Sequence, residues 1–374
     1  MKISINQNQL VNVLQKVIGP TTTKINFPIL NNVLIETCVN DKSVSEKENA
    51  VKFTSTDLEI TIISFVNAQI FEEGKVTVPT KRIFSIAREL PLKEVILESI
   101  DNNLLIKCEK IEFRINGLNP EEFPEIPKEE NIPLIKINPQ KLSEMIRRTS
   151  FSVDYENIGS ILNGIFFEIF NNEITMVSTD GRRLSLIKKE LPPAQPEVKN
   201  KISFILPIKA IQEIQKLIKD REEDVLLSVE KNRVNFDCKG TQLIVQCIEG
   251  DFPDYSHYLS KISENKLVVN RRDFLFALRR ADLLSTPEHQ EIKIILEKNE
   301  MTITQFTPQI GEVKENLEVE YAGDDFKIGF NPKYLIDVLK NIETDNVCFE
   351  LFTSEEPIIL KENGYIHLIS PMRI

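Results

Sequence analysis

The sequence has few of the residues that most often build catalytic and metal sites. It contains no Trp and only 3 His (His257, His289 and His367), so a histidine metal site or a Ser-His-Asp triad has few candidate residues. Its 5 Cys are odd in number and never spaced as CxxC, which indicates reduced core thiols. The motifs GxxxxGK[ST], GxGxxG, HExxH and GxSxG are absent as well. We therefore expect no catalytic residues, no cofactor and no metal.

Long apolar runs are also missing. No run of about 18 apolar residues could span a bilayer, and the N-terminal segment MKISINQNQL lacks the apolar stretch of a signal peptide. We therefore expect a cytoplasmic location and no membrane partner. With 12 Gly and 19 Pro the chain is not fibrous or of low complexity, and 41% hydrophobic residues can build real cores. A chain of 374 residues favours two or three domains.

One pattern occurs three times along the chain. Each copy is a short strand, an Asn and an amphipathic helix, and Asn6, Asn138 and Asn270 follow one another at a constant interval of 132 residues. Asn is a good helix N-cap because its side-chain oxygen accepts from a free N–H of the first turn. A second amphipathic helix, entered from a strand through a Pro, follows in each third. The repeated unit is therefore a sheet with two helices.

Strand-like alternation fills the rest of each third, and two Pro- and charge-rich segments separate the thirds. These segments run from Asn119 to Pro133 and from Gly250 to Lys266. We predict an α+β fold of three tandem domains, each with two helices packed on antiparallel sheets. Their predicted extents are residues 1–128, 129–260 and 261–374.

The net charge of −11 argues at first against nucleic acid, because phosphate binding needs Lys and Arg. Within the six predicted helices, however, 17 basic residues stand against 8 acidic ones, and only the sixth helix is neutral. A basic helical surface on an acidic chain would attract phosphates to that surface alone. The alternative is that Lys and Arg are simply good helix formers on solvated faces, and charge alone leaves both open. With no base-reading motif in the sequence, any DNA contact should be directed at the backbone.

Several segments, in their order and spacing, resemble the bacterial DNA polymerase III beta subunit family, the sliding clamps, from end to end. They are GPTTTKINFPILNNVLIE (Gly19 to Glu36), VPTKRIFSIARELP, GLNPEEFPEIP, LNGIFFE (Leu162 to Glu168), STDGRRLSL (Ser178 to Leu186), GDFPDY, GFNPKYLIDVL and the terminal SPMRI. The resemblance implies a non-catalytic processivity factor made of clamp domains. Two chains would pair head to tail as a homodimer, so that six domains form a ring around double-stranded DNA and tether the polymerase. The implied partners are the DNA polymerase III catalytic subunit, the clamp loader and other replication and repair proteins with a clamp-binding motif.

The resemblance also implies residues for three surfaces. For DNA they are Lys24, Arg88 and Lys216, to which the charge count adds Arg147, Arg148, Arg279 and Arg280. For an apolar pocket that takes a partner peptide they are Leu162, Thr179, Gly181, Arg183, Leu184, Pro253, His257, Tyr258, Tyr334, Pro357, Leu368, Pro371, Met372 and Arg373. For the dimer interface they are Arg82, Phe113, Ile115, Leu283 and Leu284.

Three features depart from the family pattern. His257 stands where relatives often have Arg, and His289 is polar where an apolar residue is expected, which puts the peptide preference in question. The loop from Asp154 to Ser160, which touches DNA in relatives, has no Arg or Lys here. Its contribution to DNA binding is therefore open.

Two other functions remain as alternatives. An enzyme could use Asp57 and Asp180, which end matching strands, as paired carboxylates or metal ligands, but their place in repeated units argues against one shared site. A peptide-binding scaffold that does not encircle DNA would need only the apolar pocket. The cationic helices argue against that scaffold.

Overall fold

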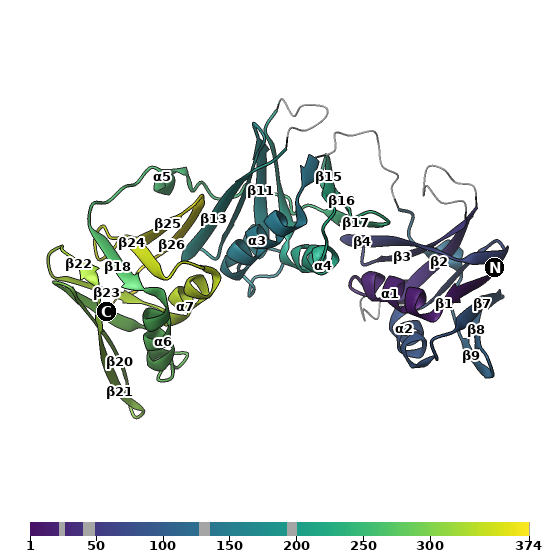
Figure 1. Cartoon of the computed structure of the whole chain (residues 1–374), viewed down its shortest axis with the longest axis horizontal. Coiled ribbons are helices and arrows are strands. Elements are labelled where there is room, and N and C mark those ends of the chain that lie inside the picture. The colour runs from purple at the N-terminus through teal and green to yellow at the C-terminus, as the bar shows by residue number, and fades with distance from the viewer. Residues whose placement is uncertain (22–26, 40–48, 127–134, 193–199, 374) are drawn as a thin grey trace. The chain divides into compact units, whose positions relative to one another are not determined.

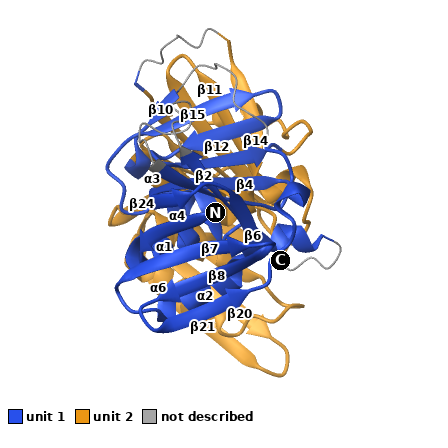
Figure 2. Ribbon diagram, turned by 90° about the vertical axis from the view of Figure 1, so that its right-hand side faces the viewer, with its two compact units in different colours: residues 1–140, 192–198, 212–247 blue, residues 141–191, 199–211, 248–374 orange. Residues whose placement is uncertain are grey.

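The computed structural model describes residues 1–21, 27–39, 49–126, 135–192 and 200–373 (Figure 1). The chain divides into two compact units (Figure 2). Unit 1 contains residues 1–140, 192–198 and 212–247, and unit 2 contains residues 141–191, 199–211 and 248–374. Among the described residues, no helix is long and apolar enough to cross a membrane.

Unit 1 contains two antiparallel sheets. Across the five-stranded sheet the order is β5 (Gln69–Glu72), β1 (Lys2–Asn6), β7 (Glu94–Ile100), β8 (Asn103–Cys108) and β9 (Ile111–Ile115). Across the eight-stranded sheet the order is β10 (Ile135–Ile137), β15 (Val225–Glu230), β16 (Arg233–Asp237), β17 (Thr241–Gln246), β4 (Ile60–Asn67), β3 (Asn49–Thr56), β2 (Asn32–Val39) and β6 (Lys75–Pro79). Alternate residues of the strands are buried, as the period of two predicts.

Unit 2 also contains two antiparallel sheets. Across the nine-stranded sheet the order is β14 (Ile202–Pro207), β11 (Gly164–Phe170), β12 (Glu173–Thr179), β13 (Arg183–Glu190), β26 (Tyr365–Ile369), β25 (Ile358–Glu362), β24 (Asn346–Glu350), β18 (Lys266–Asn270) and β22 (Glu320–Tyr321). Across the four-stranded sheet the order is β21 (Gly311–Glu318), β20 (Glu300–Thr307), β19 (Ile292–Glu297) and β23 (Phe326–Phe330).

The two helices predicted for each third are confirmed. They are α1 (Gln7–Val17) and α2 (Thr80–Glu89), α3 (Pro139–Thr149) and α4 (Ile208–Ile218), and α6 (Arg271–Asp282) and α7 (Pro332–Asn341). The short helix α5 (Ser256–Leu259) was not predicted and lies in the second of the Pro- and charge-rich segments.

The repeated Asn residues cap the first helix of each third. The side-chain oxygens of Asn6, Asn138 and Asn270 accept from the amide two residues later at 3.1, 3.0 and 3.0 Å. Each such cap contributes about 1 kcal/mol. Behind its cap, α1 buries Leu10, Leu14 and the other apolar residues of its stripe and packs on α2 and β4.

Two sheets continue past the predicted domain boundaries. In unit 1, residues 60–64 of β4 pair with residues 241–245 of β17. In unit 2, residues 183–187 of β13 pair with residues 365–369 of β26. In both cases the fourth strand of one predicted domain binds the last strand of the next. The two compact units therefore share the middle domain between them, and the boundaries at residues 128 and 260 stay a prediction.

Candidate functional site

Three of the cations predicted to bind DNA lie exposed on helices. They are Arg88 on α2, Lys216 on α4 and Arg279 on α6. Arg88 and Arg279 each lie 5.7 Å from the centre of a Phe ring of their own helix. Lys216 pairs with Glu213 at 2.8 Å, but its side chain stays 66% exposed. Although Glu213 itself is buried, all three cations expose side chains that an anionic partner could reach.

Arg147 and Arg148, at the end of α3, bind residues of the third predicted domain. Arg147 pairs with Glu343 at 2.8 Å. Arg148 pairs with Glu362 at 3.5 Å and with Glu144 at 3.3 Å, and its side chain is only 9% exposed. Because Arg148 is buried, DNA has little access to its charge. We assign both Arg147 and Arg148 to the joint between the middle and third domains.

The two remaining residues predicted to contact DNA are Arg280 and Lys24. Arg280 forms a two-point ion pair with Glu315 of β21, with one Nε to Oε2 distance of 2.8 Å. This hydrogen bonding raises the pKa of Arg280 and lowers the pKa of Glu315. Lys24 lies outside the described residues.

The loop from Asp154 to Ser160 is organised by its first residue. The Asp154 carboxylate accepts from the Asn157 side chain at 2.6 Å and from the amides of Glu156 and Asn157, and these bonds lower the pKa of Asp154. The loop exposes apolar groups, with Tyr155 at 51% and Ile158 at 88%. It therefore offers DNA no cation, as its sequence indicates.

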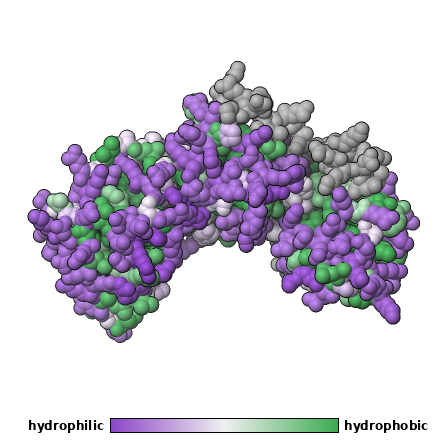
Figure 3. Space-filling model, in the orientation of Figure 1, coloured by the Kyte–Doolittle hydropathy of each residue, from purple (hydrophilic) through white to green (hydrophobic). Residues whose placement is uncertain are grey.

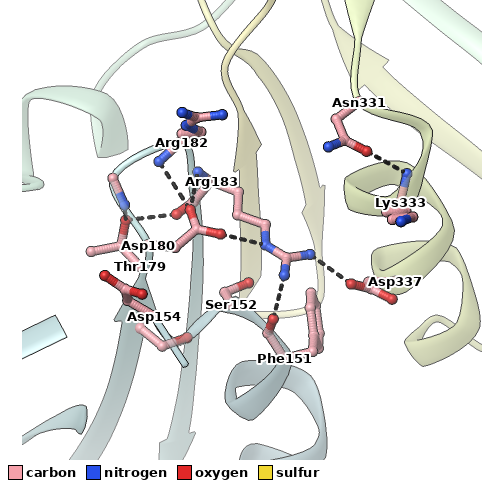
Figure 4. Close-up of polar contacts among 12 residues, drawn as sticks. Phe151, Ser152, Asp154, Thr179, Asp180, Arg182, Arg183, Asn331, Lys333 and Asp337 are labelled. Atoms are coloured by element: carbon pink, nitrogen blue, oxygen red, sulfur yellow. Dashed lines mark hydrogen bonds and ion pairs between the residues drawn. The ribbon is translucent and has the colours of Figure 1, made fainter. Parts of the chain in front are cut away.

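Arg183, at the start of β13, binds three acceptors (Figure 4). Its Nε donates to Asp180 Oδ2 at 3.0 Å, its Nη1 to Asp337 Oδ2 at 2.7 Å, and its Nη2 to the Phe151 carbonyl at 2.6 Å. Its guanidinium lies 4.6 Å from the ring centre of Tyr334. Since Asp337 and Tyr334 belong to α7, this side chain ties the middle domain to the third.

The matching residues Asp57 and Asp180 hold their own turns. Asp57 Oδ1 accepts from the second and third amides after it at 3.1 and 2.7 Å, and Asp180 Oδ1 does the same at 2.9 and 3.0 Å. A carboxylate that replaces a turn carbonyl in this way has a structural role. Among the described residues, no group of three His, Cys, Asp or Glu side chains could hold a metal ion.

Apolar side chains gather where β13 meets β26, and we call this group the apolar cluster. Its buried members are Val177, Leu184, Leu186, Ile359 and Leu368. Its half-buried members are Phe166, Phe252, Tyr255, Tyr258, Leu259, Phe352 and Ile366. Half-buried aromatic and aliphatic groups over a buried floor are what a peptide-binding pocket offers.

Of the predicted pocket residues, the structure brings Leu184, Leu368 and Tyr258 into the apolar cluster. The prediction missed the aromatic residues Phe166 and Phe252, whose rings stack 5.1 Å apart. Both lie in segments that carried the family resemblance, LNGIFFE and GDFPDY, so the segments were found but not these side chains.

A second set of predicted pocket residues surrounds Arg183. The Thr179 hydroxyl donates to the Arg183 carbonyl at 2.6 Å and accepts from the Gly181 amide at 3.0 Å. Gly181 has a φ of +82°, a conformation that favours glycine. The C-terminal segment is held nearby, since the Met372 amide donates to the Gly329 carbonyl at 2.8 Å.

The remaining predicted pocket residues lie outside the apolar cluster as far as the described residues go. Leu162, Pro357 and Pro371 are half-buried, whereas Pro253, His257 and Arg373 are exposed. The His257 ring lies 5.4 Å from that of Tyr258. It therefore borders the cluster through one aromatic contact.

A buried chain of hydrogen bonds crosses the same joint. Ser152 Oγ lies 2.7 Å from Ser185 Oγ, which lies 2.8 Å from His367 Nδ1. Burial, with the nearby Arg183 charge, lowers the pKa of His367 to about 3. A Ser beside a His could suggest a nucleophile and its base, but Ser185 and His367 are 0% and 1% exposed, so no substrate reaches them.

The residues predicted for a subunit interface lie on both units. In unit 1, Phe113 of β9 is 39% exposed, Ile115 is buried and Arg82 is exposed on α2. In unit 2, Leu283 is 81% exposed and Leu284 is half-buried.

Each of the two units also has an edge strand that bears on the predicted interface. β9 and β21 each form an edge of their sheet. Apolar side chains also gather at the free end of the β20–β21 hairpin (Figure 3), where Phe306 is 65% and Ile310 is 56% exposed. An open strand edge beside exposed apolar groups is suited to pairing with another strand.

Family models of the DNA polymerase III beta subunit match all three thirds of the chain. The N-terminal domain model matches residues 1–127, the central domain model residues 136–254 and the C-terminal domain model residues 258–373. The chain is 31% identical to the beta sliding clamp of Chlamydia trachomatis, over 100% of this chain and 87% of that protein. It is 32% identical to the beta sliding clamp of Staphylococcus epidermidis, over 100% and 99% of the two chains.

Solved structures of similar proteins share the fold. The DNA polymerase III subunit beta of Pseudomonas aeruginosa has a TM-score of 0.92 at 26% identity, with 100% of both chains covered. A sliding clamp of the same organism, bound to griselimycin, has a TM-score of 0.91 at 26% identity and the same coverage. The DNA polymerase sliding clamp of Bacillus subtilis has a TM-score of 0.92 at 26% identity, over 100% and 99% of the chains.

The buried His367 predicts a pH-dependent stability. Between about pH 6 and pH 4 the unfolded chain binds a proton at this imidazole and the folded chain does not. The free energy of unfolding should therefore fall by about 1.4 kcal/mol per pH unit from this group as the pH drops.

Urea denaturation across this range, with His367→Gln beside the parent chain, measures the effect. In the His367→Gln variant, the free energy of unfolding should fall less steeply as the pH drops, because the contribution of His367 is gone. Replacing the exposed His257 by Gln is the matched control and should keep the parent slope. Equal slopes for the parent and His367→Gln would contradict the prediction.

Proposed function

The chain belongs to the DNA polymerase III beta subunit family, the beta sliding clamps, and we propose that two copies form a ring around double-stranded DNA. The ring catalyses nothing; it keeps the replicative polymerase at a high effective concentration beside its template. The partners are the polymerase catalytic subunit, the clamp loader and other replication and repair proteins with a clamp-binding motif. We place this activity in the cytoplasm.

The repeated strand pairing carries the proposal. Within the chain, the fourth strand of one domain twice binds the last strand of the next, as β4 with β17 and β13 with β26. The same rule applied once more pairs β21, the fourth strand of the third domain, with β9, the last strand of the first. Both are sheet edges, so the missing partner is a second copy, and a head-to-tail dimer uses each edge once.

DNA contact in this proposal comes from exposed helix cations. Arg88, Lys216 and Arg279 lie on helices of the first, second and third domains in turn. Contacts of this kind reach phosphates and carry no sequence information. Lys24, Arg147 and Arg280 are secondary candidates. Lys24 lies outside the described residues, and Arg147 and Arg280 bind carboxylates and are less exposed than Lys216.

The partner peptide in this proposal binds over the apolar cluster. Leu184, Leu368 and Tyr258 supply the apolar surface, and the Arg183 network fixes the strand that carries Leu184. We assign Met372 and Pro371 to one side of this pocket; the segment that carries them is held in place by the hydrogen bond from the Met372 amide to the Gly329 carbonyl. The dimer interface consists of Phe113 and Ile115 from one copy and Leu283 and Leu284 from the other, with Arg82 nearby.

If the protein forms a closed ring around DNA, its retention should depend on whether the DNA has free ends. After loading, the protein should stay on closed circular DNA and leave within seconds to minutes once the circle is linearised, because only the free end releases a closed ring. Gel filtration of labelled protein with circular and with cut templates measures this. Equal retention on both templates would contradict encirclement and leave a peptide-binding scaffold as the function.

The interface assignment predicts that Leu283→Asp weakens the dimer. A carboxylate at an apolar contact loses burial energy and adds a desolvation cost, so the dimer dissociation constant should rise at least about a hundredfold. Sedimentation equilibrium measures the change. Leu92→Asp, at a residue that is 69% exposed and outside the proposed interface, is the control and should leave the dimer intact. A stable Leu283→Asp dimer would refute the assignment.

A similar sliding clamp binds griselimycin, and we propose that this compound binds the present chain over the apolar cluster. The pocket assignment then predicts that Met372→Ala weakens griselimycin binding. A half-buried apolar side chain contributes about 1–2 kcal/mol to such a contact, so the dissociation constant should rise about tenfold. Calorimetric titration measures it, with sedimentation to show that the dimer is unchanged. Lys333→Ala, an exposed change on α7, is the control. Unchanged affinity in Met372→Ala would count against the pocket.

A further inference from the structure

The third domain contains a cleft of about 790 Å³ that the proposed function does not use. Residues of β18 and β22 line it. These two strands, labelled in Figure 1, pair through Leu267 with Tyr321 and Val268 with Glu320. All the residues that line it belong to unit 2. We call it the acidic cleft because of its rim, which consists of Glu264, Glu320, Asp324 and Asp325.

The rim carries uncompensated negative charge. All four carboxylates belong to exposed residues, and none forms an ion pair with any residue that the structure describes. One cation, Lys266, also lines the cleft. Four like charges around one concave surface attract a cationic ligand and repel an anionic one.

The turn that closes the cleft has a fixed shape. The Tyr321 hydroxyl donates to the Asp324 carbonyl at 2.7 Å. A Cβ added to Gly323 would lie 2.5 Å from Asn265 Oδ1 and 2.6 Å from Tyr321 Oη, so a larger residue at this position would have to displace the ends of these two side chains. Asn265 Oδ1 itself is an acceptor without a hydrogen-bond partner among the described residues. The wall therefore contains an unused acceptor, which a ligand N–H could pair with after a small movement of the turn.

One aromatic side chain joins the acidic cleft to the apolar cluster. Phe352 lines the cleft and also packs against the cluster that contains Leu184 and Leu368. Lys261 bridges the same region, with its Nζ 5.7 Å from the Phe352 ring centre and 5.9 Å from that of Tyr258. Its charge is matched by Glu356 at 2.8 Å. Beside it, Ile262 is 78% exposed, an apolar group with nothing over it in the described chain.

We propose that the acidic cleft docks a basic segment of a partner protein whose neighbouring apolar residues bind the apolar cluster. The segment passes over Phe352, places Lys or Arg side chains against Glu320, Asp324 and Asp325, and covers Ile262. This proposal rests on the proposed function, because the apolar cluster is the partner pocket. It extends the footprint of that pocket across the third domain to β18 and β22 and predicts a preference for partners that carry basic residues beside their apolar motif.

A protein segment fits this surface better than a free polyamine or a metal ion. The cleft has an aromatic wall in Phe326 and Phe352, which small cations do not need. It also continues into a second apolar surface, which a single small cation could not reach. A polyamine is therefore an outcome that the test must separate from a peptide.

The probe is the peptide acetyl-Lys-Phe-Lys-Leu-Lys-amide, with its Glu-for-Lys counterpart as the charge control. Fluorescence anisotropy on the full chain should show binding of the Lys peptide, weakened by added salt, and no binding of the Glu peptide. The variant Glu320→Gln/Asp324→Asn/Asp325→Asn should weaken the Lys peptide at least about tenfold. Ala322→Arg, which adds a cation to the wall, should weaken it as well.

The matched control removes the same charge elsewhere. Glu73→Gln/Glu122→Gln/Glu222→Gln changes three exposed acids that lie outside the cleft and form no ion pair within the described chain. It should leave the affinity within a factor of two of the parent value. An equal loss in both triple variants would show that only net charge matters and would overturn the proposal.

Two further experiments distinguish a peptide site from a polyamine site and the acidic cleft from the pocket. Spermidine that displaces the Lys peptide at equal or lower concentration would make the cleft a polyamine site and overturn the proposal. Griselimycin, proposed above to bind over the apolar cluster, serves as the probe of the pocket. If griselimycin binds and the Lys peptide does not, the acidic cleft proposal fails while the proposed function stands. If the Lys peptide binds at the cleft and griselimycin does not bind at all, the pocket fails instead.

Discussion

The backbone pairing of β13 with β26 is the interaction on which the candidate site depends. It sets Leu184 opposite Leu368 and Ser185 opposite His367, so one register builds both the apolar cluster and the buried hydrogen-bond chain. A slip by one residue would turn each of these side chains to the other face of the sheet. Register and pocket are therefore specified together.

Ion pairs at this joint reinforce the strand pairing. Arg147, Arg148 and Arg183 of the middle domain bind Glu343, Glu362 and Asp337 of the third. The structure corrects the predicted charge of the last repeated helix: α7 ends at Asn341, before Glu343, so it carries Lys333, Lys340 and Asp337 and is basic instead of neutral. Its one acid, Asp337, is the partner of the largely buried Arg183. Arg148 and Arg183 are about nine-tenths buried, and their partners Glu362 and Asp337 are partly buried, so removing either Arg would leave a partly buried carboxylate without its cation.

The sequence predicted what depends on local rules. The caps at Asn6, Asn138 and Asn270 and the six helices behind them follow from neighbouring residues, and the structure has all of them. Long-range partners could not be predicted in the same way. The charge count treated Arg148 as a free cation, because nothing near it in sequence reveals Glu362. The acidic cleft could not be predicted from the sequence either, because the acids of its rim are separated in the chain, with one at residue 264 and the others within residues 320–325.

The strand pairing also decides how the assembly responds to dilution. β4 and β17 belong to one chain, and so do β13 and β26. If one of these pairs separates, its two strands stay tethered, so the rate at which they pair again does not depend on the protein concentration. In the proposed dimer, a seam between β9 and β21 of two copies has no such tether, and its reclosing would depend on how many free copies are present. The lifetime of the proposed ring would therefore be set at its two untethered seams.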